Sequence, residues 1–317
     1  MLSTLLYHVV HETRYAYSVP VSLSRQLLHL TPRDTLWQSC RSHRLFVEPL
    51  PTCQRERIDA LGNLVNEFAI EAPHQFLRVR AESVVALMPR SGGSLQAGSG
   101  DWLAASPPWE DVSRTLAYHG TPAQPEVSCF QFESPAVEVG RDFADYASHS
   151  FLPGRPLLQS AYALMQRIFD EFDFDPEATT VSTPVREVLQ RRRGVCQDFA
   201  HLMLACLRSL GLSARYVSGY LLTQPPPGEP RLIGADASHA WVSVFCPKFG
   251  WVDFDPTNAM LPTHEHVTLA WGRDFTDVSP MRGVILGGGE QQLDVAVTVT
   301  PLTADSSGEE GTEHAFQ

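Results

Sequence analysis

Residues 194–200 read Gly-Val-Cys-Gln-Asp-Phe-Ala and place a cysteine at the predicted start of a helix. Gly194 precedes a run of apolar residues at helical spacing that continues to Leu210, and Gly211 supplies the C-terminal stop. Most faces of this helix of about 15 residues are apolar, so we expect it at the centre of its domain. Cys196 would then lie at the positive end of the helix dipole, which favours a reactive thiolate.

Two later stretches supply partners for this cysteine. A cysteine taken alone is more often a buried core residue, which is our interpretation of Cys206. Residues 238–245 (Ser-His-Ala-Trp-Val-Ser-Val-Phe) and 250–257 (Gly-Trp-Val-Asp-Phe-Asp-Pro-Thr) have the pattern of two strands joined by a turn. They predict a β-hairpin that carries one histidine and two acidic residues.

The register of this hairpin determines which acid can serve His239. Paired residues face the same side, so Asp255 shares a face with His239 only if the loop has an odd length or the hairpin contains a bulge. Asp253 would lie on that face as well. We favour Asp255 because Pro256 ends the ladder directly after it, where a polar group can be partly buried and still oriented.

These stretches resemble the three signature blocks of the transglutaminase-like cysteine enzymes, in the same order and at matching spacings. The blocks are residues 193–200, 238–242 and 250–257. The resemblance implies an α+β fold with a papain-like core, in which a central helix packs on an antiparallel sheet. It also implies that Cys196 is the nucleophile, that His239 is the general base and acid, and that Asp255 orients the imidazole.

The resemblance extends to both ends of the chain. Residues 7–63 resemble the β-rich domain that precedes this core in a bacterial branch of the family, and residues 272–280 also fit that branch. Residues 293–299 alternate and predict a last strand, which we expect to return to a sheet. The expected organisation is a β-sandwich-like domain over 1–88, a linker over 89–105, a catalytic core with a C-terminal strand over 106–300 and a flexible tail over 301–317.

The implied chemistry is acyl transfer from an amide through a thioester. The backbone N–H of Cys196 is the expected first oxyanion donor, and Gln197, Trp241 and Ser238 are candidates for the oxyanion hole or the cleft wall. Water would make the chain a cysteine peptidase or amide hydrolase, which we favour by analogy. A lysine amine would make it a cross-linking protein-glutamine transamidase, and a catalytically silent binding module with the same fold is the third reading.

Composition limits the partners. The chain of 317 residues has 24 Lys and Arg against 36 Asp and Glu, for a net charge of −12, which disfavours nucleic acids and anionic membranes. We expect a protein or peptide substrate, and the oligomeric state stays open. The start has no signal-peptide pattern and the six cysteines show no paired spacing, so we expect reduced thiols in a cytoplasmic protein.

No cofactor is expected. Residues 264–266 (His-Glu-His) suggest metal ligands, but adjacent positions in a short loop cannot build a closed tetrahedral site, so we expect no metal. Residues 224–238 form a loop with a proline-rich tip that leads into His239. This loop is either one wall of the substrate cleft or a plain surface connection.

Overall fold

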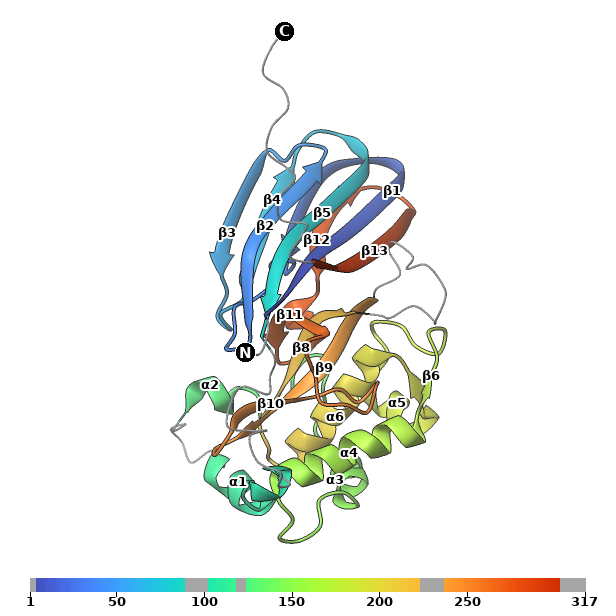
Figure 1. The fold of residues 1–317 in the computed structure, drawn as a ribbon. Helices are drawn as coiled ribbons and strands as arrows, with labels where there is room; N and C mark the ends of the chain where they lie inside the picture. The colour runs from blue at the N-terminus through green and yellow to red at the C-terminus, as the bar shows by residue number, and fades with distance from the viewer. Residues whose placement is uncertain (1–3, 89–101, 118–123, 223–236, 303–317) are drawn as a thin grey trace, which may run out of the picture.

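The computed structural model describes residues 4–88, 102–117, 124–222 and 237–302. Figure 1 shows two stacked parts, a β-rich domain built from both ends of the chain and an α+β core built from its middle. Residues 89–101 of the proposed linker (89–105), most of the proline-rich loop (224–238) and residues 303–317 of the proposed tail (301–317) lie outside the described residues. Residues 102–105 form a short helix and residues 301–302 end the last strand, so these parts of the expected linker and tail are wrong. Within those residues, none of the helices has the length and apolar character needed to span a membrane.

The N-terminal domain is an antiparallel sheet organised around one long strand. Its seven strands are β1 (Leu5–Leu28), β2 (Gln38–Glu48), β3 (Cys53–Ile58), β4 (Leu64–Ile70), β5 (His74–Leu87), β12 (Met281–Gly287) and β13 (Gln291–Leu302). The first half of β1 pairs with β5 and β13, and its second half pairs with β4 and β12. The register is irregular between Ala16 and Val21, so one strand serves two parts of a curled, sandwich-like sheet. The expected sheet-rich N-terminal domain is confirmed.

The C-terminal strands correct the expected extent of the catalytic core. The sequence predicts a strand over residues 293–299 within a core that extends to residue 300, but β12 and β13 both pair with β1 in the N-terminal sheet. Leu6 pairs with Leu302 and Tyr17 with Gln291. These strands cover backbone N–H and C=O groups that β1 would otherwise expose at an edge. The chain therefore leaves the first domain, forms the core and returns.

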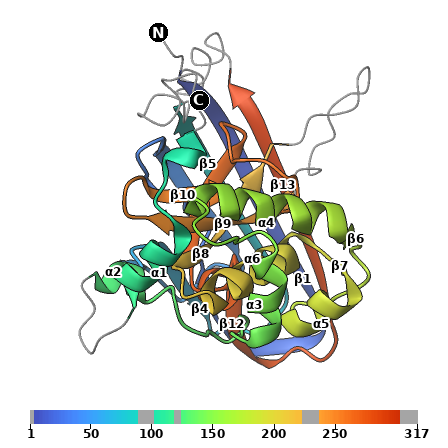
Figure 2. The same cartoon turned by 90° about the horizontal axis from the view of Figure 1, so that it is seen from below.

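The core is a four-stranded antiparallel sheet with helices on one side. Its strands run in the order β10 (Gly250–Phe254), β9 (Ala237–Cys246), β8 (Ala214–Leu221) and β11 (His266–Gly272). The longer helices are α1 (Trp109–Leu116), α3 (Arg141–Ser148), α4 (Leu157–Glu171), α5 (Val185–Arg191) and α6 (Cys196–Ser209). The short elements are η2 (Trp102–Ala105), α2 (Pro125–Ser128), α7 (Phe275–Val278), β6 (Asp173–Phe174) and β7 (Arg193–Gly194). Figure 2 shows α3, α4 and α6 gathered over the sheet when the molecule is seen from below.

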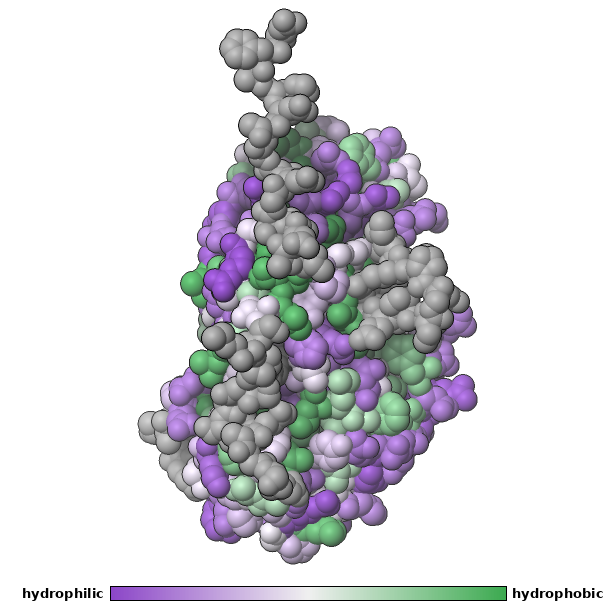
Figure 3. Space-filling view, in the orientation of Figure 1, coloured by the Kyte–Doolittle hydropathy of each residue, from purple (hydrophilic) through white to green (hydrophobic). Residues whose placement is uncertain are grey.

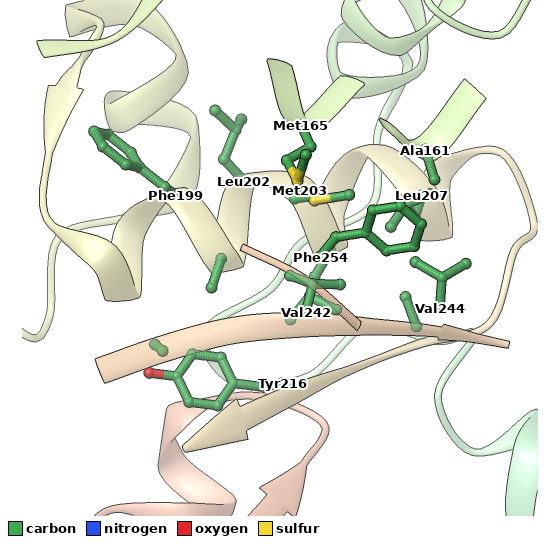
Figure 4. Close-up of a cluster of buried hydrophobic side chains, with 14 of the residues drawn as sticks. Ala161, Met165, Phe199, Leu202, Met203, Leu207, Tyr216, Val242, Val244 and Phe254 are labelled. Carbon is green, nitrogen blue, oxygen red and sulfur yellow. The ribbon is translucent and has the colours of Figure 1, made fainter. Parts of the chain in front are cut away.

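Helix α6 lies at the centre of this core, as the apolar pattern predicts. Figure 4 shows Met203 and Leu207 of α6 between Met165 of α4 and the sheet residues Val244 and Phe254. All five side chains are fully buried. Burying one such side chain contributes about 1.5–3 kcal/mol, so the position of α6 is set by packing on two sides. Its first residue, Cys196, is held in place by that packing.

Both ends of α6 follow from particular residues. The backbone N–H of Val195 donates to Asp198 Oδ2 at 2.9 Å, which satisfies one of the free donors at the helix start. A Cβ at Gly194 would lie 2.7 Å from the same oxygen, so only glycine fits beside this cap. At the other end Gly211 has φ +73°, a conformation that favours glycine and terminates the helix.

The two domains are joined by amide side chains that act as strand partners for β11. Asn63 donates to the carbonyl of Trp271 at 2.9 Å and accepts from its N–H at 3.0 Å. Gln38 donates to the carbonyl of Thr268 at 2.6 Å and accepts from its N–H at 2.8 Å. The N-terminal domain is therefore docked on the core by specific hydrogen bonds.

On the face seen in Figure 3, hydrophilic residues dominate the upper and lower parts and apolar residues gather nearer the middle.

Candidate active site

The β9–β10 hairpin brings His239 and Asp255 to one face of the sheet. Cys246 pairs with Gly250 and Val242 with Phe254, which leaves a loop of residues 247–249. This loop has an odd length, so the condition set by the sequence is met. Asp255 follows the last paired residue of β10 and lies diagonally across from His239.

His239 lies between the thiol of Cys196 and the carboxylate of Asp255. His239 Nε2 donates to Asp255 Oδ2 at 2.7 Å. The thiol of Cys196, the first residue of α6, lies close enough to the same imidazole to raise its pKa. Because Nε2 is occupied by the carboxylate, Nδ1 is the nitrogen left for the sulfur. The structure therefore pairs His239 with Asp255, and not with Asp253.

The surroundings of His239 favour its charged form. Burial by itself lowers the pKa of this imidazole, since only 8% of the residue is exposed. Hydrogen bonds and charges from Asp255 and Cys196 outweigh burial and raise the pKa of His239 to about 10. The imidazole is therefore an imidazolium at neutral pH, the form that stabilises a neighbouring thiolate and can protonate a leaving amine.

Asp255 is fully buried and richly hydrogen-bonded. Its Oδ2 accepts from His239, from His266 Nε2 at 3.1 Å and from Asn258 Nδ2 at 2.8 Å. Its Oδ1 accepts from the backbone N–H groups of Thr257 at 3.0 Å and Asn258 at 3.3 Å. Burial tends to raise the pKa of Asp255, but the two histidines hold it well below its usual range. The carboxylate is thus ionised and fixed in orientation.

His266 is part of this cluster, although the sequence suggested it only as one of the two histidines in a rejected metal motif. The residue is 1% exposed. The N–H of Thr263 points at its Nδ1 at 3.4 Å, which leaves the proton on Nε2 for donation to Asp255. No local pattern could show this contact, because Asp255 lies 11 residues away and on a different part of the sheet.

Comparison with known proteins shows which family the chain belongs to. Residues 7–86 match the bacterial transglutaminase-like N-terminal region, and residues 147–256 match the transglutaminase-like superfamily. An uncharacterized protein of Mycobacterium tuberculosis is 41% identical over 305 residues, which cover 95% of this chain and 94% of that protein. The chain belongs to the transglutaminase-like superfamily.

Two further likenesses concern the fold and part of the core. A solved structure from Cytophaga hutchinsonii, a protein proposed to be a cysteine protease, has a TM-score of 0.71 at 17% identity and covers 99% of this chain and 95% of that one. At this identity the likeness shows the fold alone. A protein-glutamine gamma-glutamyltransferase of Pseudomonas aeruginosa is 32% identical over 108 residues, which cover 32% of this chain and 16% of that protein.

Within this member of the superfamily, Trp241 covers the two histidines. Its fully buried ring lies 6.1 Å from the ring of His239 and 5.2 Å from that of His266, centroid to centroid. The indole N–H donates to Asp253 at 3.2 Å. A Cβ at Gly219 would lie 2.4 Å from the indole, so glycine on β8 makes room for the tryptophan. Trp241 shields the histidine–carboxylate cluster, and its N–H is engaged away from Cys196.

The other two candidates lie near the triad. Gln197 follows Cys196 in α6, and its amide points at the carbonyl of Val181 at 3.4 Å. Ser238 is exposed and directly precedes His239 on β9. The roles of Gln197, Trp241 and Ser238 in an oxyanion hole or cleft wall stay predictions.

His239, Asp255 and His266 are also the described residues whose ligand atoms could surround a metal ion. These atoms lie within 4.8 Å of one another. In the structure they are joined by hydrogen bonds of 2.7 and 3.1 Å, and a cation would displace the protons that orient Asp255. Their arrangement is accounted for by the hydrogen bonds alone.

Proposed function

We propose that this chain is a cysteine hydrolase that cleaves amide or peptide bonds through a thioester on Cys196. The observation that supports this most strongly is the line from Cys196 through His239 to Asp255, with the sulfur at a helix N-terminus. A thiolate, an imidazolium and a buried carboxylate in this order are the groups that acyl transfer from an amide requires.

In the first half of the reaction, the Cys196 thiolate attacks the carbonyl carbon and a C–S bond forms. The carbonyl electrons move to oxygen, and the backbone N–H of Cys196, the first residue of α6, is the donor that we propose for it. As the tetrahedral intermediate collapses, the C–N bond breaks and His239 gives its proton to the departing amine. A thioester and a neutral imidazole result.

In the second half, water attacks the thioester while His239 takes one of its protons. The C–S bond then breaks, the carboxylic acid leaves, and the thiolate–imidazolium pair is restored. Asp255 keeps the same ring orientation in both halves because its other hydrogen bonds do not depend on the substrate.

The alternative acceptor is a primary amine, which would make the chain a protein-glutamine transamidase. The similarity of part of the core to the Pseudomonas aeruginosa glutamyltransferase favours testing it. In that case a lysine amine would attack the thioester and an isopeptide bond would form. The residues and their roles would be the same, so the acceptor must be identified by experiment.

The first test is the rate of Cys196 alkylation by iodoacetamide at pH 6, measured by peptide mass spectrometry. Cys53 is exposed and serves as the ordinary thiol within the same chain. We expect Cys196 to react at least about 10-fold faster than Cys53, because a free thiol is almost fully protonated at this pH. We expect the advantage to disappear in His239→Ala. Equal labelling of Cys196 in both chains would contradict the ion pair.

A second test identifies the acceptor. Peptide amides and glutamine-containing peptides are incubated with the protein in ¹⁸O-water, with and without methylamine. The masses of the products are then measured by mass spectrometry. Hydrolysis places ¹⁸O in the released acid, whereas transamidation yields the methylamide. The Cys196→Ala chain is the control for both products. Cleavage that persists in this control would refute the assignment of the nucleophile.

A further inference from the structure

A second candidate site lies where the core sheet faces the N-terminal domain. A cavity of about 1120 Å³ is lined by loop residues 33–37 and 60–61, by α2 and by residues of β8, β10 and β11. Figure 1 shows α2 and the β10 end of the core sheet on the same side of the molecule. None of the described residues in its lining belongs to the triad.

A stack of rings and guanidinium groups forms one wall of this cavity. The guanidinium carbon of Arg215 lies 3.6 Å from the ring centroid of Trp271 and 4.2 Å from that of Trp251. The guanidinium of Arg33 lies 3.5 Å from the same Trp271 ring. Two guanidinium groups cannot share one ring face at these distances, so Trp271 separates them. The stack fixes the plane of Arg215 and leaves its N–H edge as the part that can bind.

The donors of Arg215 are not used by the described part of the protein. The residue is only 9% exposed, and its Nε is buried without a hydrogen-bond partner among the described residues. The terminal Nη groups are therefore the donors that a molecule in the cavity can reach. Burial lowers the pKa of Arg215 to about 9, against the attraction of the Asp253 carboxylate. A charged group that is buried without hydrogen bonds destabilises a protein unless something else satisfies it.

Arg208 is a buried arginine whose hydrogen bonds are satisfied by the protein itself. It is 2% exposed, and its guanidinium donates to the carbonyls of Ala214 at 2.9 Å, Phe132 at 3.2 Å and Arg273 at 2.5 Å. Arg215 is nearly as buried but faces a cavity in place of carbonyl groups. The difference indicates that the missing acceptor of Arg215 comes from a bound molecule.

We propose that this cavity binds a single carboxylate carried on an apolar body, with Arg215 as the anchor. A monoanion suits the site because Asp253 and Glu126 also line it and would repel the second charge of a phosphate group. Arg33 is already engaged, since it donates to Asn63 at 2.7 Å. Arg215 is therefore the guanidinium whose fork can take both oxygens of one carboxylate.

The rest of the lining indicates the body of the ligand. Leu61, Phe130 and Val217 contribute apolar surface opposite and beside the stack. The cavity, of about 1120 Å³, lies slightly above the range of about 300–1,000 Å³ that is typical of pockets for drug-sized molecules. Two sources share this chemistry, the C-terminal carboxylate of a peptide that ends in an apolar residue and a small apolar organic acid.

The test is calorimetric binding to the full Cys196→Ala chain, which leaves amide probes intact. The probes are N-acetyl-Ala-Ala-Phe with a free carboxylate, the same peptide as a carboxamide, and 3-phenylpropionate. We expect the free carboxylate to bind at least about 10-fold more tightly than the carboxamide. Tight binding of phenylpropionate assigns the site to small acids, and binding of the peptide alone assigns it to C-termini. Equal binding of peptide acid and amide, or no binding of either acid at millimolar concentration, overturns the proposal.

A variant and a spectroscopic readout locate the binding. Arg215→Lys keeps the charge but loses the fork, so affinity for the acid falls at least about 10-fold, whereas Arg141→Lys on the exposed surface leaves it unchanged. In the chain with native arginines, the indole N–H resonances of Trp251 and Trp271 shift with the acid and that of Trp109 does not. These resonances show whether the acid binds in the cavity even if the Arg215→Lys chain does not fold. Unshifted Trp251 and Trp271 resonances at saturating acid refute the site.

Discussion

The two ends of the core sheet each bury a charged side chain, but only one of the two side chains is hydrogen-bonded by the surrounding protein. At the catalytic end, Asp255 accepts hydrogen bonds from His239, His266 and Asn258 and from backbone N–H groups. At the cavity end, the described residues offer Arg215 two tryptophan rings and leave its Nε without an acceptor. The first region is complete within the protein and preorganised for chemistry. The second becomes complete only when a ligand supplies the acceptor.

A direct connection joins the two regions. Asp253 accepts the indole N–H of Trp241, whose ring covers His239, and its charge also acts on Arg215. Asp253 pairs with Ser243, four residues along β9 from His239, or about 13 Å at the usual rise of a strand. Alternate residues of a strand face one side, so a single sheet face carries both sites.

The largest effect is expected from removal of the groups that react. Cys196→Ala and His239→Ala each lower kcat/KM by about 10³-fold or more, because nucleophile and general acid act as one unit. Initial rates on the best amide substrate measure this. Cys53→Ser, which changes an exposed thiol, is the matched control and keeps full activity. Substantial activity in Cys196→Ala would refute the whole catalytic assignment.

A smaller effect, of about 10²-fold, is expected for Asp255→Asn. Although burial lowers the pKa of His239, Asp255 helps to raise it to about 10, so loss of the carboxylate lowers that pKa. The imidazolium is then lost at lower pH, and the alkaline limb of the kcat/KM profile moves downward. A pH–rate profile of both chains checks the direction. An alkaline limb at the same pH in both would show that Asp255 does not control His239.

An effect of about 10-fold on kcat is expected for His266→Phe, which removes a donor to Asp255 but keeps a ring under Trp241. His266→Gln retains an amide donor and restores part of the rate. Steady-state kinetics together with unfolding midpoints separate the two roles. If both variants lose stability equally and neither changes kcat, His266 is a structural residue and not a positioning one.

The smallest effect is expected at the cavity end. Arg215→Met changes the free energy of unfolding without ligand by within about 1 kcal/mol, since lost ring contacts are offset by the removal of an unsatisfied buried charge. The matched variant Arg208→Met destabilises by about 3 kcal/mol, because it leaves buried carbonyls without a donor. Urea unfolding of the three chains measures both. An equal loss of unfolding free energy in the two variants would contradict the proposed difference between Arg215 and Arg208.

The proposed catalytic groups are readable from the sequence because their signals are local. Gly194 and Asp198 mark the start of a helix within a few residues of Cys196. In the structure α6 begins at Cys196, as predicted. His239 and Asp255 belong to one hairpin, whose alternation shows that they can share a face once the loop length is odd. The order of the three blocks then indicates the superfamily and the α+β core.

By itself, therefore, the sequence determined the central helix, the catalytic hairpin and the sheet-rich start of the chain. Only the tertiary structure decided that residues 281–302 return to β1, that His266 holds Asp255, and that Arg215 lies between two tryptophans. Each of these joins segments from different elements, such as Leu6 and Leu302. Such pairing depends on which edges and surfaces the whole fold buries, and no local period along the chain records that.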